Sequence, residues 1–397
     1  MRRVAFAFLT LFRKCARFAR RLSGKTPADV ASARIVSGKS WDEFCMSLRA
    51  AGAALNFPGS PQDPFSQTEG YRYLSRLVRA GLMAFVEYAD DRAPVIHRVA
   101  HETVKLGADN PDNYYQTASI NGAYEYRIRG RRNSIAYLSF GTQSGNYGEG
   151  RGLPPTGHVE AQDLEIDDDG HFEIFLSAEP QEKNWLPMTS ETGTLVIRQT
   201  FLNRDEEIPA ELHIERINCE MADRMPMPLS PEKLDAGLRQ AGTLVTGASL
   251  MFSKWARDFK RHSNELPLFD PDRSLAAGGD PNITYYHSHW QLEKDEALLI
   301  EVVPPACEYW NFQLNNYWME SLDYRYHRIH TNKHLAHYEV DGSVCIVVSH
   351  VDPGLPNWLE TTGHTSGTMC FRWIRAENPV QPSTQVVKLT ELGNLRT

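Results

Sequence analysis

The positions of apolar residues predict helices near the start of the chain and again in its middle. In residues 40–55 and 67–88, apolar side chains recur every three or four positions, as on a buried helix face. Ser40 followed by Glu43 has the form of a capping box, which would begin the first helix there. A third helical pattern covers residues 230–262 and opens on a serine and a proline, which are favoured at the N-cap and in the first turn.

Between and after these helices the pattern has a period of two, which is typical of strands. Tyr124, Tyr126 and Ile128 alternate with polar residues, so one face of this strand is expected to be buried. Short alternating segments separated by turn residues continue to about residue 218 and resume over 285–376. This spacing indicates β-sandwich or jelly-roll units.

The two β regions repeat each other. The Asn-Trp-Leu run at 184–186 recurs at 357–359, and Arg198 recurs as Arg372 near the end of the second region. The starts of the two regions also correspond. We therefore predict that one β unit was duplicated and that the two copies pack around a pseudo-twofold axis.

These patterns define the expected fold class and domain organisation. The chain is expected to be mainly β with a helical N-terminal region, and its two duplicated β-sandwich/jelly-roll units are joined by a long helix. The predicted parts are a basic amphipathic helix, a helical region, the first unit, a helix with a linker, and the second unit, at residues 1–23, 24–105, 106–225, 226–280 and 281–397.

At the repeated motif the sequence resembles a known family. The run from Asn184 to Pro187, followed by a strand carrying Arg198, is similar to the signature of the bacterial domain-of-unknown-function family 1214. The segment 109–113, followed by Tyr115, resembles the start of such chains. The resemblance implies a β-sandwich or jelly-roll fold and supplies no reaction, because fold alone does not define function.

Composition narrows the class of protein. Of 397 residues, 41% are hydrophobic and 23% charged, which is the balance of a globular protein. Six cysteines form no C-x-x-C pair, so a reducing, cytoplasmic compartment is expected. The net charge is −8, and residues 1–23 alone carry +7, so the rest of the chain holds −15. Such an acidic body argues against a nucleic-acid partner, because phosphate contacts need a basic surface.

Residues 1–23 place their basic side chains within one arc of a helix and a stripe of apolar side chains elsewhere on it. This pattern favours a helix lying on an anionic membrane surface, which would make the protein peripheral at the membrane. Two alternatives remain: a signal peptide, although no small-residue cleavage site follows, and a helix docked on the acidic body or on a partner.

Histidines suggest one candidate site. His287 and His289 are two residues apart on a predicted strand, so their imidazoles would share one face. That spacing suits a divalent metal in a cupin-like site, although buried or surface histidines without a metal would show it too. A further ligand could come from His327, His330, His334, His337, Glu293 or Glu320. The first copy has residues 116–118 where the second has 287–289. The cofactor is unknown from sequence alone.

Aromatic and amide side chains suggest a second candidate site. Residues 309–318 alternate, which places Tyr309, Asn311, Gln313 and Tyr317 on one sheet face. Rings and amides on one face suit a glycan or an amphipathic molecule, and a solvated sheet face is the alternative. The other expected ligand-binding residues are Tyr115, Arg198, Trp290, Trp358 and Arg372. The repeated Trp and Arg could equally form a corner that locks two sheets together.

The sequence therefore predicts a protein that binds, and by preference processes, a glycan or another hydroxyl-rich amphipathic ligand. Hydrolase or lyase chemistry is favoured, with His287, His289, Glu320 and Tyr286 as acid/base candidates. One alternative is a metal-dependent enzyme that uses His287 and His289 as ligands. The other is a non-catalytic binding or assembly protein. Substrate and oligomeric state do not follow from these patterns.

Overall fold

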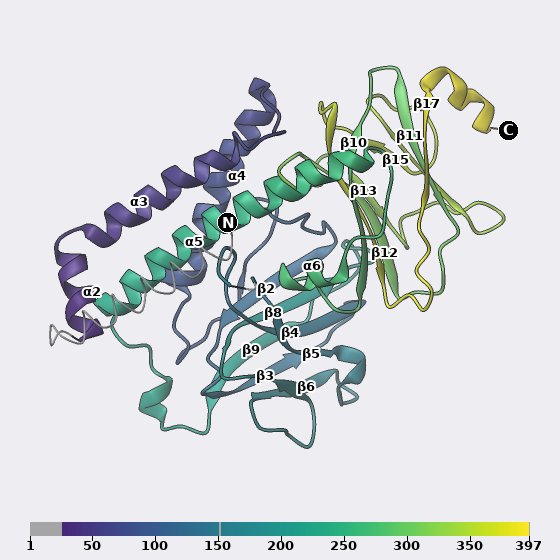
Figure 1. The fold of residues 1–397 in the computed structure, drawn as a ribbon. Helices are drawn as coiled ribbons and strands as arrows, with labels where there is room; N and C mark the ends of the chain where they lie inside the picture. Colours follow the sequence, from purple (N-terminus) through teal and green to yellow (C-terminus); the bar gives the residue numbers. More distant parts are fainter. Residues whose placement is uncertain (1–25, 151, 397) are drawn as a thin grey trace.

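The computed structural model describes residues 26–150 and 152–396. A layer of helices lies against two β-rich units in it (Figure 1). The basic helix predicted over residues 1–23 lies outside the described residues. Within the described part of the chain, no helix is both long and apolar enough to cross a membrane.

The helical layer is built around the long helix α5, which joins the two units. Ser230 accepts a hydrogen bond from the backbone N–H of Lys233, and Pro231 occupies the first turn, so both predicted start signals are confirmed. The helices are α2 (Pro27–Val36), α3 (Lys39–Ala51), α4 (Pro64–Leu82), α5 (Pro231–Phe259) and α6 (Pro271–Ala276), with the π-helical turn η2 (Met83–Glu87) after α4. Short 3-10 turns are η1 (Gly52–Ala54), η3 (Ala161–Asp163), η4 (Met221–Arg224), η5 (Lys260–His262) and η6 (Leu389–Arg396).

The capping box predicted at Ser40 was wrong. Helix α3 begins at Lys39 after Gly38, whose φ of 76° is left-handed and therefore suits glycine. Ser40 lies inside the first turn, where its hydroxyl donates to Asp235 of α5 at 2.5 Å. A tertiary contact thus uses the hydroxyl that the local pattern assigned to a cap.

The first unit is a sandwich of two sheets. One sheet has the order β1-β2-β8-β4-β5 and the other the order β7-β6-β3-β9. The strands are β1 (His97–Arg98), β2 (Asn113–Ser119), β3 (Glu125–Arg131), β4 (Tyr137–Ser144), β5 (Pro155–Glu160), β6 (His171–Ser177), β7 (Trp185–Pro187), β8 (Thr192–Thr200) and β9 (Glu211–Ile217).

The second unit repeats this sandwich strand for strand. Its sheets have the orders β10-β16-β12-β13 and β15-β14-β11-β17, which are the orders of the first unit, β1 excepted, with every label advanced by eight. This agreement confirms the predicted duplication. The strands are β10 (Ile283–Gln291), β11 (Glu296–Val302), β12 (Tyr309–Asn315), β13 (His330–Asn332), β14 (Val344–Ser349), β15 (Trp358–Glu360), β16 (Ser366–Ile374) and β17 (Ser383–Lys388).

The pairing of strands shows which residues correspond in the two copies. Tyr115 of β2 lies opposite Arg198 of β8, and Tyr285 of β10 lies opposite Arg372 of β16. Tyr115 therefore corresponds to Tyr285, and each copy supplies one tyrosine and one arginine to the same sheet position.

The same register corrects one sequence-based alignment. Two residues beyond the tyrosines, Thr117 corresponds to His287, and Ser119 corresponds to His289. The expected match of 116–118 with 287–289 was therefore wrong by one residue. A shift of one residue exchanges the two faces of a strand, so register decides which side chains are equivalent.

The repeated Asn-Trp-Leu run forms the same corner in both units. Asn184 and Asn357 have φ angles of 44° and 54°, a left-handed conformation that asparagine tolerates. Each asparagine side chain bonds both backbone groups of one residue in a neighbouring segment. The indoles of Trp185 and Trp358 donate to the carbonyls of Ser177 and Ser349 at the ends of β6 and β14. The motif joins β7 to β6 and β15 to β14.

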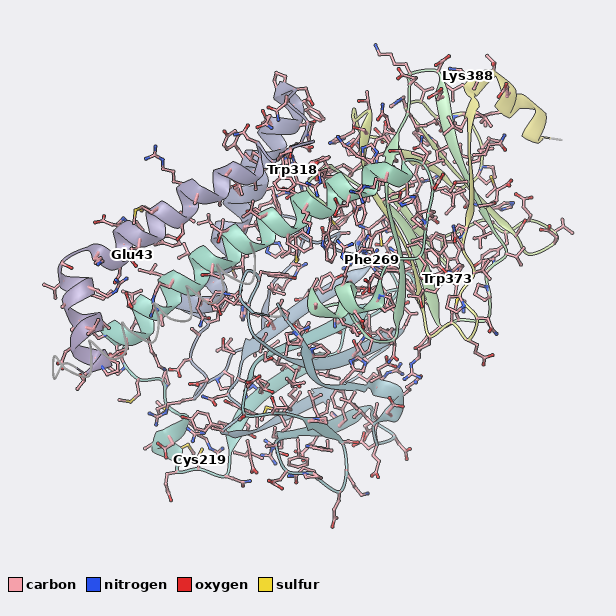
Figure 2. The ribbon with its side chains drawn as sticks, in the orientation of Figure 1. Glu43, Cys219, Phe269, Trp318, Trp373 and Lys388 are labelled. Atoms are coloured by element: carbon pink, nitrogen blue, oxygen red, sulfur yellow. The ribbon has the colours of Figure 1, made fainter. Side chains whose placement is uncertain are left out.

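Aromatic side chains pack between the helical layer and the second unit. Trp318 is 1% exposed, and its indole donates to the carbonyl of Ser66 on α4. Phe269 packs against Trp255 and Phe259 of α5, with ring centroids 4.8 and 5.8 Å apart. Figure 2 shows Phe269 between α5 and the strands of the second unit. These contacts leave one large space unfilled beside α5.

Candidate functional site

A cavity of about 940 Å³ lies where both units meet the helical layer. This volume is in the range of small-molecule sites, about 300–1,000 Å³. It is lined by β2 and β8 of the first unit, by β10 and β16 of the second, and by α5. The wall of the cavity is therefore shared between the two copies.

The cavity is long and changes character along its length. On α5 its lining extends from Lys233 to Trp255, which is about 33 Å at the helical rise per residue. At one end it is lined by Arg198, Arg372 and several tyrosines. At the other end apolar side chains of η2 and of residues 226–229 predominate, beside the charged side chains of Glu87, Asp90, Asp91 and Lys233. Lys233 and Asp90 pair with each other at 3.3 Å. Such a space suits a molecule with one polar and one apolar end.

Arg372 is the main electrostatic feature of the polar end. It is 4% exposed, and it makes no ion pair with any residue that the structure describes. Its guanidinium donates to the side-chain oxygens of Asn311 and Gln313, at 3.3 and 2.6 Å, and to the carbonyl of Ala108. All three acceptors are neutral. A buried charge is costly unless a counter-charge accompanies it, so this end of the cavity favours an anion.

Arg198 is the equivalent residue of the first unit and is better compensated. It is 9% exposed and donates to the carbonyl of Gly278 at 2.5 Å. One nitrogen also lies 3.5 Å from an oxygen of Asp280. Asp109 lines the cavity as well, but Ser321 donates its amide and hydroxyl to the two oxygens of that carboxylate. Of the two guanidiniums at the polar end, that of Arg372 is therefore the one without an ion-pair partner among the described residues.

Tyrosine hydroxyls complete the polar end. Tyr115 and Tyr285 lie within electrostatic range of both arginines. Their hydroxyls accept backbone N–H groups from Asn110 and Asp280, at 3.0 and 3.4 Å. Burial raises the pKa of both tyrosines, so each hydroxyl keeps its proton and can donate to a ligand.

His287 and His289 occupy different surroundings. His287 lines the cavity, packed against the rings of Phe259, Phe269 and Tyr285, and its Nδ1 has no hydrogen-bond partner in the described structure. Burial, with a smaller contribution from Arg372, lowers its pKa to about 3. His289 does not line the cavity, and burial beside Lys260 lowers its pKa to about 4. Both imidazoles are neutral near pH 7, which makes them poor general acids.

The other acid/base candidates lie apart from His287. Tyr286 points to the opposite face of β10, into the core of the second unit. Glu320 is buried against α4, where Arg76 lies 2.6 Å from its carboxylate. Trp290, expected to bind ligand, is fully buried in the same core as Tyr286. The structure thus does not bring the four acid/base candidates together.

The aromatic and amide face predicted on β12 is covered. Tyr309, Asn311, Gln313 and Tyr317 are at most 4% exposed, and none of them lines the cavity. This face is therefore neither solvated nor accessible to a ligand, because segment 108–112 lies over it and binds its polar groups. Asn311 and Gln313 instead hold Arg372 in place. Trp358 lies at the corner of β15, outside the cavity.

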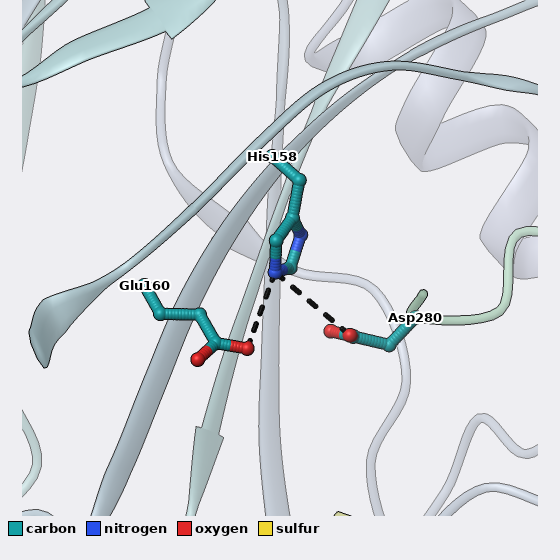
Figure 3. A group of neighbouring side chains, drawn as sticks. All are labelled: His158, Glu160 and Asp280. Carbon is teal, nitrogen blue, oxygen red and sulfur yellow. Dashed lines mark hydrogen bonds and ion pairs between the residues drawn. The ribbon is translucent and has the colours of Figure 1, made fainter. Parts of the chain in front are cut away.

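His158, Glu160 and Asp280 form a compact group between the two units (Figure 3). Nε2 of His158 lies 3.3 Å from Glu160 and 3.9 Å from Asp280. Among the described residues, this is the group with three ligand atoms near enough to share a metal ion, and neither His287 nor His289 belongs to it. The metal-dependent alternative therefore lacks a third ligand at its predicted place.

The carboxylates of the group at His158 are already neutralised, so the group is an ion-pair network between the two units rather than a metal centre. We call this network, His158, Glu160 and Asp280 with Arg198 and Arg375, the lock. Arg375 pairs with Glu160, and Arg198 with Asp280, so each carboxylate already faces a guanidinium. Tyr137 and Asn282 donate to one oxygen of Glu160, each at 2.5 Å. An added dication would have to displace these donors and would meet two arginines.

The lock predicts a loss of stability in acid. Burial alone would raise the pKa of Glu160, but the hydrogen bonds from His158, Tyr137 and Asn282, with Arg375, lower it to about 2. A lowered carboxyl pKa stabilises the fold above the unfolded value of 4.5, and this contribution disappears as the pH falls to about 2. It amounts to about 3 kcal/mol.

Glu160→Gln is therefore expected to lower the free energy of unfolding by up to about 3 kcal/mol at pH 7 and to flatten its fall between about pH 5 and pH 2. Urea unfolding at several pH values measures both effects. Glu301→Gln, an exposed change on β11, is the control and is expected to leave the curve unchanged. An unaltered acid transition in Glu160→Gln would contradict the lock.

Sequence reasoning found four residues of the cavity and missed others. Tyr115, Arg198, His287 and Arg372 were predicted and line it. Tyr285 was missed, although its register match to Tyr115 in the repeat could have pointed to it. The contributions of α5 and η2 carry no such signal, because on an amphipathic helix a cavity wall and a packed core look alike.

These features define a class of protein: two β-sandwich units related by duplication, with a cavity between them and a covering helix. Two segments of the chain, residues 116–200 and 292–378, match the family model described as a protein of unknown function, DUF1214. The chain belongs to this family. No curated protein matches the chain.

Two solved structures are similar to this chain. An uncharacterized protein from Burkholderia cenocepacia is 48% identical, with a TM-score of 0.88, and the similarity covers 91% of this chain and 99% of that one. A protein from Vibrio parahaemolyticus is 12% identical, covers 81% of this chain and 98% of its own, and has a TM-score of 0.47.

Proposed function

We propose that the cavity binds an amphipathic small molecule whose anionic oxygen group lies between Arg198 and Arg372 and whose apolar part extends along α5. The observation that carries this proposal is the buried guanidinium of Arg372, which has only neutral acceptors. Guanidinium groups match the planar geometry of a carboxylate with two parallel hydrogen bonds. The protonated hydroxyls of Tyr115 and Tyr285 are additional donors.

The apolar walls support the second half of this assignment. Beyond Arg198 on β8, Val196 and Thr194 follow on the same face, and Leu244 faces the cavity from α5. A glycan has no long apolar part to pack against these walls. Of the ligands expected from the sequence, we therefore favour an amphipathic molecule and add that its polar end is anionic. Binding without catalysis is the simpler function, because within the described part of the chain the neutral His287 makes no hydrogen bond or ion pair with a carboxylate.

A binding series with matched chain length tests the proposal. Dodecanoate, dodecyl phosphate and dodecanol are titrated into the full-length protein by calorimetry, and the complexes are counted by native mass spectrometry. We expect one-to-one binding of an anionic probe at least ten-fold tighter than that of dodecanol, because hydrogen bonds to a charged group contribute about 1.5–3 kcal/mol. Equal affinity for the alcohol would overturn the assignment of the polar end.

A further inference from the structure

One end of the cavity opens on an exposed apolar segment. Pro226, Met227 and Leu229 line the cavity, yet Met227 and Leu229 are 56% and 55% exposed. Met221 and Met225 in the same stretch are 73% and 60% exposed. We call residues 221–229 the methionine segment. Because Met227 and Leu229 both line the cavity and are exposed to solvent, we take this end of the cavity, away from the arginines, as its mouth.

Four large apolar side chains exposed within nine residues are unusual for a surface. Single exposed apolar residues need no explanation, but a group of them marks an interaction site. Methionine is flexible and polarisable, so a methionine-rich surface adapts to partners without a fixed shape. A lipid surface is such a partner, and it is also a reservoir of anionic amphiphiles.

The basic N-terminal sequence joins the molecule at this same end. Arg34 of α2 pairs with Asp235 at the start of α5, with 2.8 Å between nitrogen and oxygen. Helix α2 therefore lies at the end of α5 that follows the methionine segment (Figure 1). The sequence just before α2 carries seven Arg and Lys and no acid in residues 1–23, which is complementary to anionic lipid headgroups.

We infer that the methionine segment contacts an anionic lipid bilayer and that the cavity exchanges its amphiphile with the bilayer through this mouth. The exchange rests on the proposed function, whereas the contact with lipid does not. The body of the protein is acidic, so apolar insertion by residues 221–229 has to act together with the charge of residues 1–23. The apolar end of the cavity, which a tail would occupy, is the end nearest to the bilayer.

Vesicle sedimentation of the full-length protein tests the contact. The vesicles are phosphatidylcholine with or without phosphatidylserine, and the variant is Met225→Asp/Met227→Asp. We expect the wild type to sediment with the phosphatidylserine vesicles and the variant to bind at least about ten-fold more weakly, because two apolar insertions are lost. Val351→Asp, at a side chain 57% exposed on the second unit, is the control and is expected to sediment like the wild type.

A second measurement needs no variant. Peroxide oxidises exposed methionines, and we expect phosphatidylserine vesicles to slow oxidation of Met221, Met225 and Met227 in the wild type, as read by mass spectrometry. Unchanged oxidation, or equal sedimentation of variant and wild type, would overturn the inference. Failure of dodecanoate to bind in vesicle-free solution would instead overturn the proposed function, so the two failures are distinguishable.

Discussion

Replacing Arg372 by glutamine is expected to weaken the binding of dodecanoate about ten- to one-hundred-fold while leaving the binding of dodecanol unchanged. The reason is that hydrogen bonds to a charged group contribute about 1.5–3 kcal/mol, and each 1.4 kcal/mol is a factor of ten. Arg198→Gln is expected to have the smaller effect, because Asp280 already partly neutralises Arg198. Calorimetric titration of both variants measures the difference.

Stability separates this effect from a folding defect. Arg372 has no described carboxylate partner, so its removal leaves no unpaired counter-charge, but its buried neutral acceptors lose a donor. We therefore expect the free energy of unfolding to fall by about 1–3 kcal/mol, and urea unfolding shows that the variant is folded under the conditions of the titration. Arg129→Gln on the exposed side of β3 is the matched control and should bind dodecanoate like the wild type. Wild-type affinity in Arg372→Gln would show that the anionic group lies elsewhere.

Filling the middle of the cavity is expected to select ligands by length. Val196 lies two residues from Arg198 on the same face of β8. A tryptophan at this position would occupy the path of the apolar part while leaving both arginines free. We expect Val196→Trp to lose detectable binding of hexadecanoate and to keep that of hexanoate, since only the short chain ends before the new ring.

Competition between the two acids on the variant measures this selection. Val386→Trp, a similar substitution at a partly exposed position on β17, is the control and should bind both acids like the wild type. Overpacking costs about 1–3 kcal/mol, so thermal unfolding of the variant is recorded alongside. Equal loss of both acids in a folded Val196→Trp would place the anionic group beyond the tryptophan and contradict the orientation.

The repeat made the architecture predictable. Matches such as Arg198 with Arg372 can be recognised in the sequence, because both copies keep the same strand pairing and the same corners. Ser230 could likewise be identified as a helix start, because capping depends on neighbours in sequence. Ser40 could not, because its hydroxyl bonds Asp235, almost two hundred residues away.

Only some residues of the candidate site could be predicted, because segments that are distant in sequence decide which side chains are buried. The alternation over 309–318 correctly separates two faces of β12, but it does not reveal that segment 108–112 covers one of them. Spacing likewise places His287 and His289 on one face and says nothing of Phe259 or Lys260, which come from the end of α5 and decide how each imidazole behaves.

The sequence by itself therefore determined the two copies, their strands and the joining helix, because these depend on local periods and turn residues. Only the tertiary structure decided that the two repeated arginines line one cavity, and that one of them pairs with none of the described carboxylates. The physical reason is that burial and charge compensation depend on which distant segments pack together, and no local pattern contains that information.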